Sequence, residues 1–101
     1  MPLGTAIMKH YVYLIVSFSN KKIVSYVGYT HNLNKRIALH NSSKGAKFTK
    51  GRKWELIYKR VYYNKSLAMK EEYKLKKNYK LRNEIKNKFY KKFENFNFTS
   101  L

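Results

Sequence analysis

Two short apolar stretches separated by polar residues come first along this chain. Residues 11–18 and 23–29 are rich in aromatic and β-branched residues, and the four residues between them are polar. This pattern is typical of a β-hairpin, because branched and aromatic side chains pack well on a pleated sheet and polar residues favour the turn. Residues 54–63 are bulky and alternate between apolar and polar, which predicts a third strand.

The length of the turn suggests a register for the hairpin. If Phe18 pairs with Ile23, Tyr13 lies opposite Gly28, and Tyr26 lies diagonally across on the same face. Diagonal neighbours are about 7–8 Å apart, within joint reach of one bound group, whereas a shift of one residue would separate the two phenols. A glycine inside a strand often marks the close approach of a ligand or another segment, so Gly28 is a candidate structural residue of a site.

Helical patterns lie on both sides of the third strand. Asn32 is a suitable N-cap for a helix that ends near residue 41, and Ser66 for a helix that ends near residue 77. A further basic helix is expected over residues 80–88. The order strand, strand, helix, strand, helix, helix predicts an α+β fold.

The length of 101 residues allows one domain, which we place at residues 9–88. Residues 1–8 are expected to be a non-native or disordered extension, and residues 89–101 a basic, aromatic tail that either docks raggedly or stays mobile. The apolar runs are much shorter than the roughly 20 residues that span a bilayer. The chain has no cysteine, which excludes a disulfide scaffold and thiolate metal sites. We therefore expect an intracellular protein, cytoplasmic or nucleoid-associated, with no membrane partner.

The charge of the chain is strongly one-sided, with 23 lysine and arginine residues against 5 acids and a net charge of +18. An AT-rich genome would favour lysine codons, but it would also favour aspartate, which this chain lacks. A polyanionic partner, most naturally nucleic acid, is therefore a better explanation than a merely solvated basic surface. The loop after the first helix carries the residues we expect to grip phosphates: Lys44, Lys47, Lys50 and Arg52.

Two residues of the first helix are candidates for chemistry on a phosphate. Arg36 and His40 are four residues apart and so share a helix face, where two like charges would repel. A guanidinium binds phosphate through two parallel hydrogen bonds and stabilises charge in a transition state. An imidazole can act as general acid or base, or hydrogen-bond a phosphate oxygen. The alternative is that both are ordinary solvated helix residues.

Glu71 and Glu72 form an adjacent carboxylate pair in a lysine-rich helix. They flank its apolar seam about equally, so periodicity alone does not choose between them. One carboxylate is enough for a Mg²⁺ site if waters and a substrate phosphate complete the octahedron. The alternative is pairing with neighbouring lysines, which would only stabilise the helix.

The order of these stretches resembles the GIY-YIG endonuclease domain. The resemblance covers roughly residues 11–81 and is strongest to the small stand-alone, YhbQ-like members. The matching segments are, in order, Tyr-Val-Tyr, Tyr-Val-Gly-Tyr-Thr, Leu-x-x-Arg-Ile-x-x-His-Asn, Lys-Gly-Ala-Lys-Phe-Thr-Lys-Gly-Arg, Trp-Glu-Leu-Ile-Tyr and Lys-Glu-Glu-Tyr-Lys-Leu-Lys. One departure is Tyr11, which stands in the place of the first motif's glycine, as in many YhbQ-like proteins.

The resemblance implies a three-stranded antiparallel sheet flanked by helices, in the order β-β-α-β-α-α. It also implies a site built from the two motif tyrosines, the second motif glycine, the helix arginine, a position that holds histidine or tyrosine, and the metal-binding glutamate. In this sequence the motif tyrosines are Tyr13 and Tyr26, and the glycine is Gly28. The helix arginine is Arg36, the histidine-or-tyrosine position is His40, and the metal-binding glutamate is Glu72.

The implied activity is a metal-dependent DNA endonuclease that hydrolyses phosphodiester bonds in one step. Glu72 would hold a single Mg²⁺ or Mn²⁺, Arg36 would steady the phosphate, and Tyr13, Tyr26 or His40 would prepare the attacking water. A phenol with a pKa near 10 is a poor base at neutral pH, but nearby positive charge favours the phenolate. The sequence leaves open whether the substrate is duplex or branched DNA, whether a targeting protein binds the chain, and which oligomeric state it has.

Two other functions fit the same sequence. A nucleic-acid-binding module of the same fold that cuts poorly would bind tightly and in a salt-sensitive way, with no metal requirement. A basic RNA-binding or ribosome-associated protein would account for the charge alone. Competition between structured RNA and DNA, with and without Mg²⁺, separates these from a nuclease.

Overall fold

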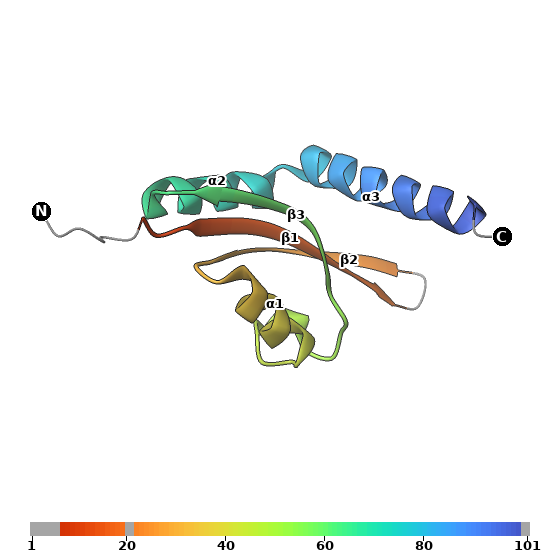
Figure 1. The fold of residues 1–101 in the computed structure, drawn as a ribbon, viewed down its shortest axis with the longest axis horizontal. Helices are drawn as coiled ribbons and strands as arrows, with labels where there is room; N and C mark the ends of the chain where they lie inside the picture. Colours follow the sequence, from red (N-terminus) through yellow and green to blue (C-terminus); the bar gives the residue numbers. More distant parts are fainter. Residues whose placement is uncertain (1–6, 20–21, 100–101) are drawn as a thin grey trace, which may run out of the picture.

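The computed structural model describes residues 7–19 and 22–99 and has the predicted order of elements (Figure 1). The elements are β1 (His10–Ser19), β2 (Lys22–Thr30), α1 (Leu33–Asn41), the short 3₁₀ turn η1 (Lys47–Thr49), β3 (Glu55–Tyr62), α2 (Lys65–Lys77) and α3 (Tyr79–Thr99). The prediction of an α+β fold with a three-stranded antiparallel sheet flanked by helices is therefore confirmed.

The sheet has the order β2-β1-β3, with β1 paired antiparallel to both neighbours. The predicted hairpin register is correct, because Phe18 pairs with Ile23 and Tyr13 with Gly28. Tyr26 pairs with Ile15, one step along the same face from Tyr13. The two phenols therefore share a face, as the candidate site requires.

The sheet is covered on both sides, and Figure 1 shows α2 and α3 on one side and α1 on the other. On the side of α2, here called the α2 face, Val12 and Leu14 pack against Ala68 and Leu75 of that helix. On the opposite side, the α1 face, Tyr13 and Ile15 pack with Leu33 and Trp54 in one buried cluster. Every residue from Val12 to Val16 is buried, as expected for a central strand covered on both faces.

The first helix begins where the sequence predicted. The Asn32 side chain accepts a hydrogen bond from the Lys35 backbone N–H at 3.1 Å, so Asn32 is the N-cap of α1. The cap predicted for α2, Ser66, is wrong. Asn64 caps this helix instead, accepting from the Leu67 N–H at 3.0 Å, because the chain becomes helical directly after β3.

The last helix is longer than predicted. It does not end near residue 88 but runs to Thr99, and so takes in most of the segment expected to be a tail. Asn78 begins it by accepting a hydrogen bond from the Leu81 N–H at 3.0 Å. No glycine or proline interrupts residues 79–99, and lysine and glutamate are good helix formers, so the backbone continues although the aromatic residues lack a clear period.

The expected extension, residues 1–8, lies outside the described residues except for Ile7 and Met8, which are exposed and precede β1. Over residues 7–19 and 22–99, no helix is both long enough and apolar enough to cross a bilayer.

Candidate active site

A chain of hydrogen bonds between side chains runs through the buried α1 face. The Tyr13 hydroxyl lies 2.7 Å from Nε2 of His40, and Nδ1 of the same ring lies 2.9 Å from the Thr49 hydroxyl. The Thr49 hydroxyl in turn donates to the Ala46 carbonyl oxygen at 2.8 Å. Tyr13, His40 and Thr49 have no exposed surface, so each depends on the others for its hydrogen bonds.

The direction of these bonds fixes the tautomer of His40. The Thr49 hydroxyl proton points at a carbonyl oxygen, which can only accept, so the hydroxyl oxygen must accept from Nδ1–H of His40. In the neutral ring Nε2 then carries no proton and accepts from the Tyr13 O–H. Tyr13 therefore has a proton acceptor directly in line with its hydroxyl.

Burial acts on the pKa values of both groups in the direction that keeps them uncharged. It raises the pKa of Tyr13 to about 12, although the Arg36 guanidinium acts in the opposite direction. Smaller increases in the pKa of Tyr13 come from Tyr26 and then from Glu72. Burial, and then the Arg36 charge, lowers the pKa of His40 below its ordinary value of 6.5. At neutral pH the pair is thus a phenol and a neutral imidazole.

Two glycines make room for this chain of hydrogen bonds. A Cβ atom on Gly28 would lie 2.2 Å from the Tyr13 hydroxyl oxygen, so the phenol can lie across β2 only if this position is glycine. A Cβ on Gly45 would lie 2.4 Å from Nδ1 of His40. The predicted structural role of Gly28 has a direct steric reason, and Gly45 has the same role for the imidazole.

Arg36 lies one helical turn before His40 and is half-buried. Its charge acts on both Tyr13 and His40, which places the guanidinium beside the hydrogen-bonded pair. Its Nε atom is buried and has no hydrogen-bond partner among the described residues. A buried donor without an acceptor costs about 1–3 kcal/mol, so the folded chain alone leaves this guanidinium incompletely satisfied.

The two adjacent glutamates face different phenols. The Glu72 charge acts on Tyr13, whereas the Glu71 charge adds to the burial that raises the pKa of Tyr62. The Glu72 side chain is 14 % exposed and pairs with Lys76 at 3.4 Å, and the more exposed Glu71 pairs with Lys74 at 3.5 Å. Of the two carboxylates, Glu72 is therefore the one whose charge raises the pKa of Tyr13.

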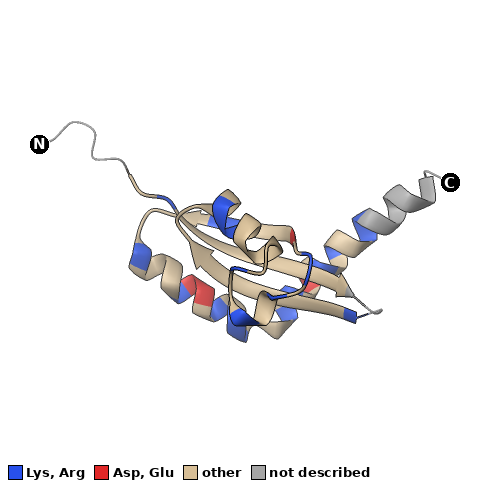
Figure 2. Cartoon of the chain, turned by 90° about the horizontal axis from the view of Figure 1, so that it is seen from below, with Lys and Arg blue, Asp and Glu red and all other residues tan. Residues whose placement is uncertain are grey.

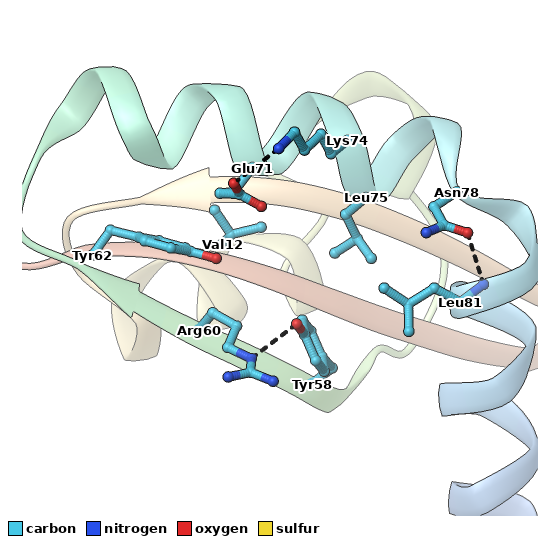
Figure 3. Close-up of a pocket in the computed structure, with 9 residues that line it drawn as sticks. All are labelled: Val12, Tyr58, Arg60, Tyr62, Glu71, Lys74, Leu75, Asn78 and Leu81. Carbon is cyan, nitrogen blue, oxygen red and sulfur yellow. Dashed lines mark hydrogen bonds and ion pairs between the residues drawn. The ribbon is translucent and has the colours of Figure 1, made fainter.

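Glu71 belongs instead to a cavity of about 160 Å³ on the α2 face (Figure 3). Figure 3 shows its carboxylate directed to Lys74, and Arg60 directed to the Tyr58 hydroxyl. The sheet separates this cavity from Tyr13 and His40, because Val12, which lines it, points to the opposite side of β1. The cavity is therefore not part of the candidate site.

Tyr26 contacts both His40 and the segment that joins α1 to β3. Its ring meets the His40 ring edge-on, with 5.3 Å between centroids, and stacks on Phe48 at 6.2 Å. Tyr26 is half-buried, unlike Tyr13. It is thus the phenol of the two that has surface in contact with solvent.

The predicted phosphate-gripping residues follow the segment that joins α1 to β3. Lys44, Lys47 and Lys50 are exposed, and Arg52 is half-buried. Figure 2, which views the chain from the side of α1, shows basic positions along this segment and few acidic positions in the part of the chain it colours. The basic loop therefore lies on the same face as Tyr13, Arg36 and His40.

The sequence did not single out three residues that hold the site together. Thr49 and Gly45 fix His40 from two sides. Asn41 closes the loop: its side chain accepts from the Trp54 backbone N–H at 2.6 Å and donates to the Trp54 carbonyl at 3.2 Å. All three lie within the segments that resemble the family, but no period or spacing marks them, because their roles depend on how the loop folds back.

The comparison with protein families identifies the type of domain. The GIY-YIG catalytic domain matches residues 9–89, and the chain belongs to this family. It is 46 % identical over 69 residues to a UPF0213 protein of Staphylococcus haemolyticus, covering 67 % of this chain and 80 % of that one. It is 44 % identical over 69 residues to a UPF0213 protein of Oceanobacillus iheyensis, covering 67 % and 77 %.

A solved structure, the solution NMR structure of a UPF0213 protein from Bacillus halodurans, is 37 % identical. It covers 76 % of this chain and 80 % of its own, with a TM-score of 0.43. UPF0213 proteins are a small stand-alone GIY-YIG family, so the predicted type of domain is confirmed.

Membership of the family carries some general properties. The domain has a nuclease fold, and GIY-YIG domains are generally endonucleases that act on nucleic acids with divalent metal ions. The name UPF0213 states no activity, so the reaction and substrate of this chain are matters for a proposal. Among the described residues, no three or more histidine or acidic side chains gather as a metal-binding group.

Proposed function

We propose that this chain is a metal-dependent endonuclease that hydrolyses phosphodiester bonds in DNA. One observation carries the proposal: the Tyr13 hydroxyl donates to a neutral His40 while the charges of Arg36 and Glu72 both act on it. Such a hydrolysis needs a base, a cation for the phosphate and a carboxylate for the metal, and this set of residues supports that assignment. The net charge of +18 supports a polyanionic substrate.

The attacking water must lose a proton, and we assign its removal to Tyr13 with His40. Transfer of the Tyr13 proton to Nε2 of His40 leaves a phenolate beside Arg36 and an imidazolium whose Nδ1–H bond to Thr49 is kept. The phenolate then takes a proton of the water as the water oxygen attacks phosphorus and the bond from phosphorus to the leaving oxygen breaks. The leaving oxygen takes a proton from solvent, and the imidazolium releases its proton to solvent. Because Tyr13 and His40 have no exposed surface, DNA binding must open the cover over the phenol, and half-buried Tyr26 is the neighbouring ring that contacts the strand.

Arg36 is assigned to the phosphate. The substrate would supply an oxygen acceptor for Nε–H, which has no partner among the described residues, and negative charge on the phosphate oxygens grows as the water attacks. Removing one such donor from an active site typically slows a reaction about 10²- to 10³-fold.

Glu72 is assigned to the metal, and its surroundings fit a hard divalent ion such as Mg²⁺ or Mn²⁺. Its oxygen atoms are the donors that these ions prefer, and a single carboxylate suffices when waters and phosphate oxygens supply the rest. Its ion pair with the exposed Lys76 side chain is of a kind that contributes only about 0–1 kcal/mol, so a cation can displace it. When bound, the ion would offset charge on the attacked phosphate and on the leaving oxygen.

The proposal is tested with supercoiled, linear, flapped and branched DNA in Mg²⁺ or in EDTA. We expect nicking in Mg²⁺ and none in EDTA. The Arg36→Ala variant, purified in the same way, should cut at least about 100-fold more slowly, which excludes a contaminating nuclease. Failure to cut any of the four DNA forms, or equal cutting in EDTA, would refute the proposal.

A second candidate is a nucleic-acid-binding module of the same fold that cuts poorly. The burial of Tyr13 and its pKa of about 12 favour it, since a covered phenol that resists ionisation is a poor base. This module would bind DNA equally well in EDTA and in Mg²⁺ and leave it intact. Arg36→Ala would then weaken binding modestly, with a smaller dependence of affinity on salt.

A further inference from the structure

Phe48 presents an aromatic ring to solvent beside the candidate active site. It belongs to η1, and 57 % of the residue is exposed. Its ring stacks on Tyr26, with 6.2 Å between centroids and 20° between planes, and lies 6.4 Å from the Trp54 ring. A single exposed aromatic residue needs no explanation. This one forms the outer end of a stack of rings that reaches His40 through Tyr26.

The backbone around Phe48 is held firmly. The next residue, Thr49, is buried and bonds His40 through its side chain, and its carbonyl oxygen accepts from Nε1–H of Trp54 at 2.9 Å. The 3₁₀ turn is closed by a hydrogen bond from the Thr49 N–H to the Ala46 carbonyl at 3.1 Å. Phe48 is therefore a fixed ring at a defined place relative to the catalytic histidine, rather than a side chain on a free loop.

The charge around Phe48 identifies the kind of partner. Lys44, Lys47 and Lys50 are exposed in the same loop, and residues 42–54 contain no acidic residue. An exposed aromatic ring among lysines is the arrangement with which proteins bind single-stranded nucleic acid, with cations on the phosphates and a ring stacked against a base. A protein partner with an apolar surface would gain little from so many uncompensated cations.

We propose that Phe48 is a stacking site for an unpaired nucleobase, so that the preferred DNA has single-stranded residues next to the cleaved bond. In a continuous duplex both faces of each base are covered by its neighbours, and a base must leave the stack to meet a protein ring. A fork, flap or junction supplies such a base without that cost. The link to cleavage rests on the proposed function, whereas the stacking itself does not.

The test uses binding in EDTA, so that it does not depend on cleavage. The probes are a forked DNA and a blunt duplex of the same length, each with 2-aminopurine, a fluorescent adenine analogue whose emission falls on stacking. In the fork the analogue occupies the first unpaired position. Affinity is measured by fluorescence anisotropy and stacking by the emission of the analogue.

Four variants separate stacking from packing. Phe48→Ala removes the ring, Phe48→Leu keeps an apolar contact on Tyr26 and Trp54 without a flat face, and Phe48→Trp keeps a flat face. Phe18→Ala is the matched control, because Phe18 is 67 % exposed and, by the alternation of side chains along β1, lies on the α2 face of the sheet. Thermal unfolding shows whether each variant is folded. If Phe48→Ala does not fold, Phe48→Leu alone shows whether the flat ring is needed for stacking.

We expect Phe48→Ala and Phe48→Leu to lose the quenching and to bind the fork about 5- to 150-fold more weakly. Their affinity for the blunt duplex should stay within about twofold. Phe48→Trp and Phe18→Ala should resemble the unaltered chain. Wild-type behaviour of Phe48→Leu, or an equal loss on fork and duplex, would overturn the stacking site. If stacking is found but no DNA is cut in Mg²⁺, the proposed function fails and the stacking site stands.

Discussion

The two faces of the sheet bury different kinds of side chain. The α2 face is an apolar cluster in which Val12, Leu14 and Val27 pack against the helix. The α1 face buries a phenol, an imidazole and a hydroxyl that satisfy one another. Burying polar groups stabilises a small domain less than burying apolar side chains, and becomes unfavourable if one partner is lost. The difference indicates that the apolar cluster of the α2 face mainly serves stability, whereas the buried polar groups of the α1 face belong to the chemistry that we propose.

The largest effects are expected from replacing one residue on each face of the sheet. We expect His40→Gln to slow cleavage about 10²- to 10⁴-fold, because Tyr13 loses its aligned proton acceptor. Leu14→Ala, on the α2 face, should lower the free energy of unfolding by about 2–5 kcal/mol through the cavity that it leaves. Cleavage rates per folded molecule and denaturant unfolding measure the two effects.

The division of roles predicts that these two effects are separable. Leu14→Ala should cut at the wild-type rate wherever it is folded. If it loses as much activity as His40→Gln at a temperature where both are folded, the α2 face also shapes the chemistry, and the division is wrong.

Two glycines of the loop after α1, Gly45 and Gly51, test whether contact with His40 matters for cleavage. Gly45→Ala places a methyl group against the imidazole, so we expect the ring to shift and cleavage to fall at least about tenfold, since small misplacements in active sites are costly. Gly51→Ala is the control. Gly51 has a φ of 75°, so alanine there should cost about 1 kcal/mol of stability. No side chain lies within 4 Å of its added Cβ, and cleavage should be unchanged.

An NMR spectrum of the His40 ring nitrogens reports the displacement directly. Gly45→Ala should change their shifts and Gly51→Ala should not. Equal loss of activity in both variants would mean that general loop strain, and not contact with His40, is responsible.

The smallest expected effect is on the pH dependence of stability. The pKa of His40 is lowered in the folded chain, so the unfolded chain binds a proton more readily below pH 6.5. The stability that this group contributes is thus present above its unfolded pKa of about 6.5 and is lost as the pH falls through the lower, folded pKa. Urea unfolding at several pH values should show a steeper acid loss for wild type than for His40→Gln. Parallel curves would show that His40 is not held neutral.

The fold and the placement of Tyr13 beside Gly28 could be predicted from the sequence because their determinants are local. Aromatic and β-branched runs predicted the first two strands, and alternation predicted the third. The turn length predicted the register that places Tyr13 opposite Gly28, and Asn32 is a strong cap for the first helix. Thr49 and Gly45 were missed because their contacts with His40 arise only after the loop folds onto α1.

Other differences arose where local preference did not decide. Asn64 and Ser66 both favour a helix start, and the end of β3 selected the earlier one. Between Glu71 and Glu72, helical periodicity was neutral. The choice depends on where α2 crosses the sheet, and the crossing brings the Glu72 charge to Tyr13 and leaves Glu71 beside Tyr62.

That pair of glutamates supplies the most direct measurement. The rate at which folded Glu72→Ala and Glu71→Ala cut the same DNA should be compared in saturating Mg²⁺, with DNA affinity measured in EDTA. We expect Glu72→Ala to be at least about 100-fold slower with affinity within about twofold, and Glu71→Ala to cut nearly as the unaltered chain does. Wild-type cutting by Glu72→Ala, or an equal loss in both variants, would contradict a metal-dependent site that combines Glu72 with Tyr13, Arg36 and His40.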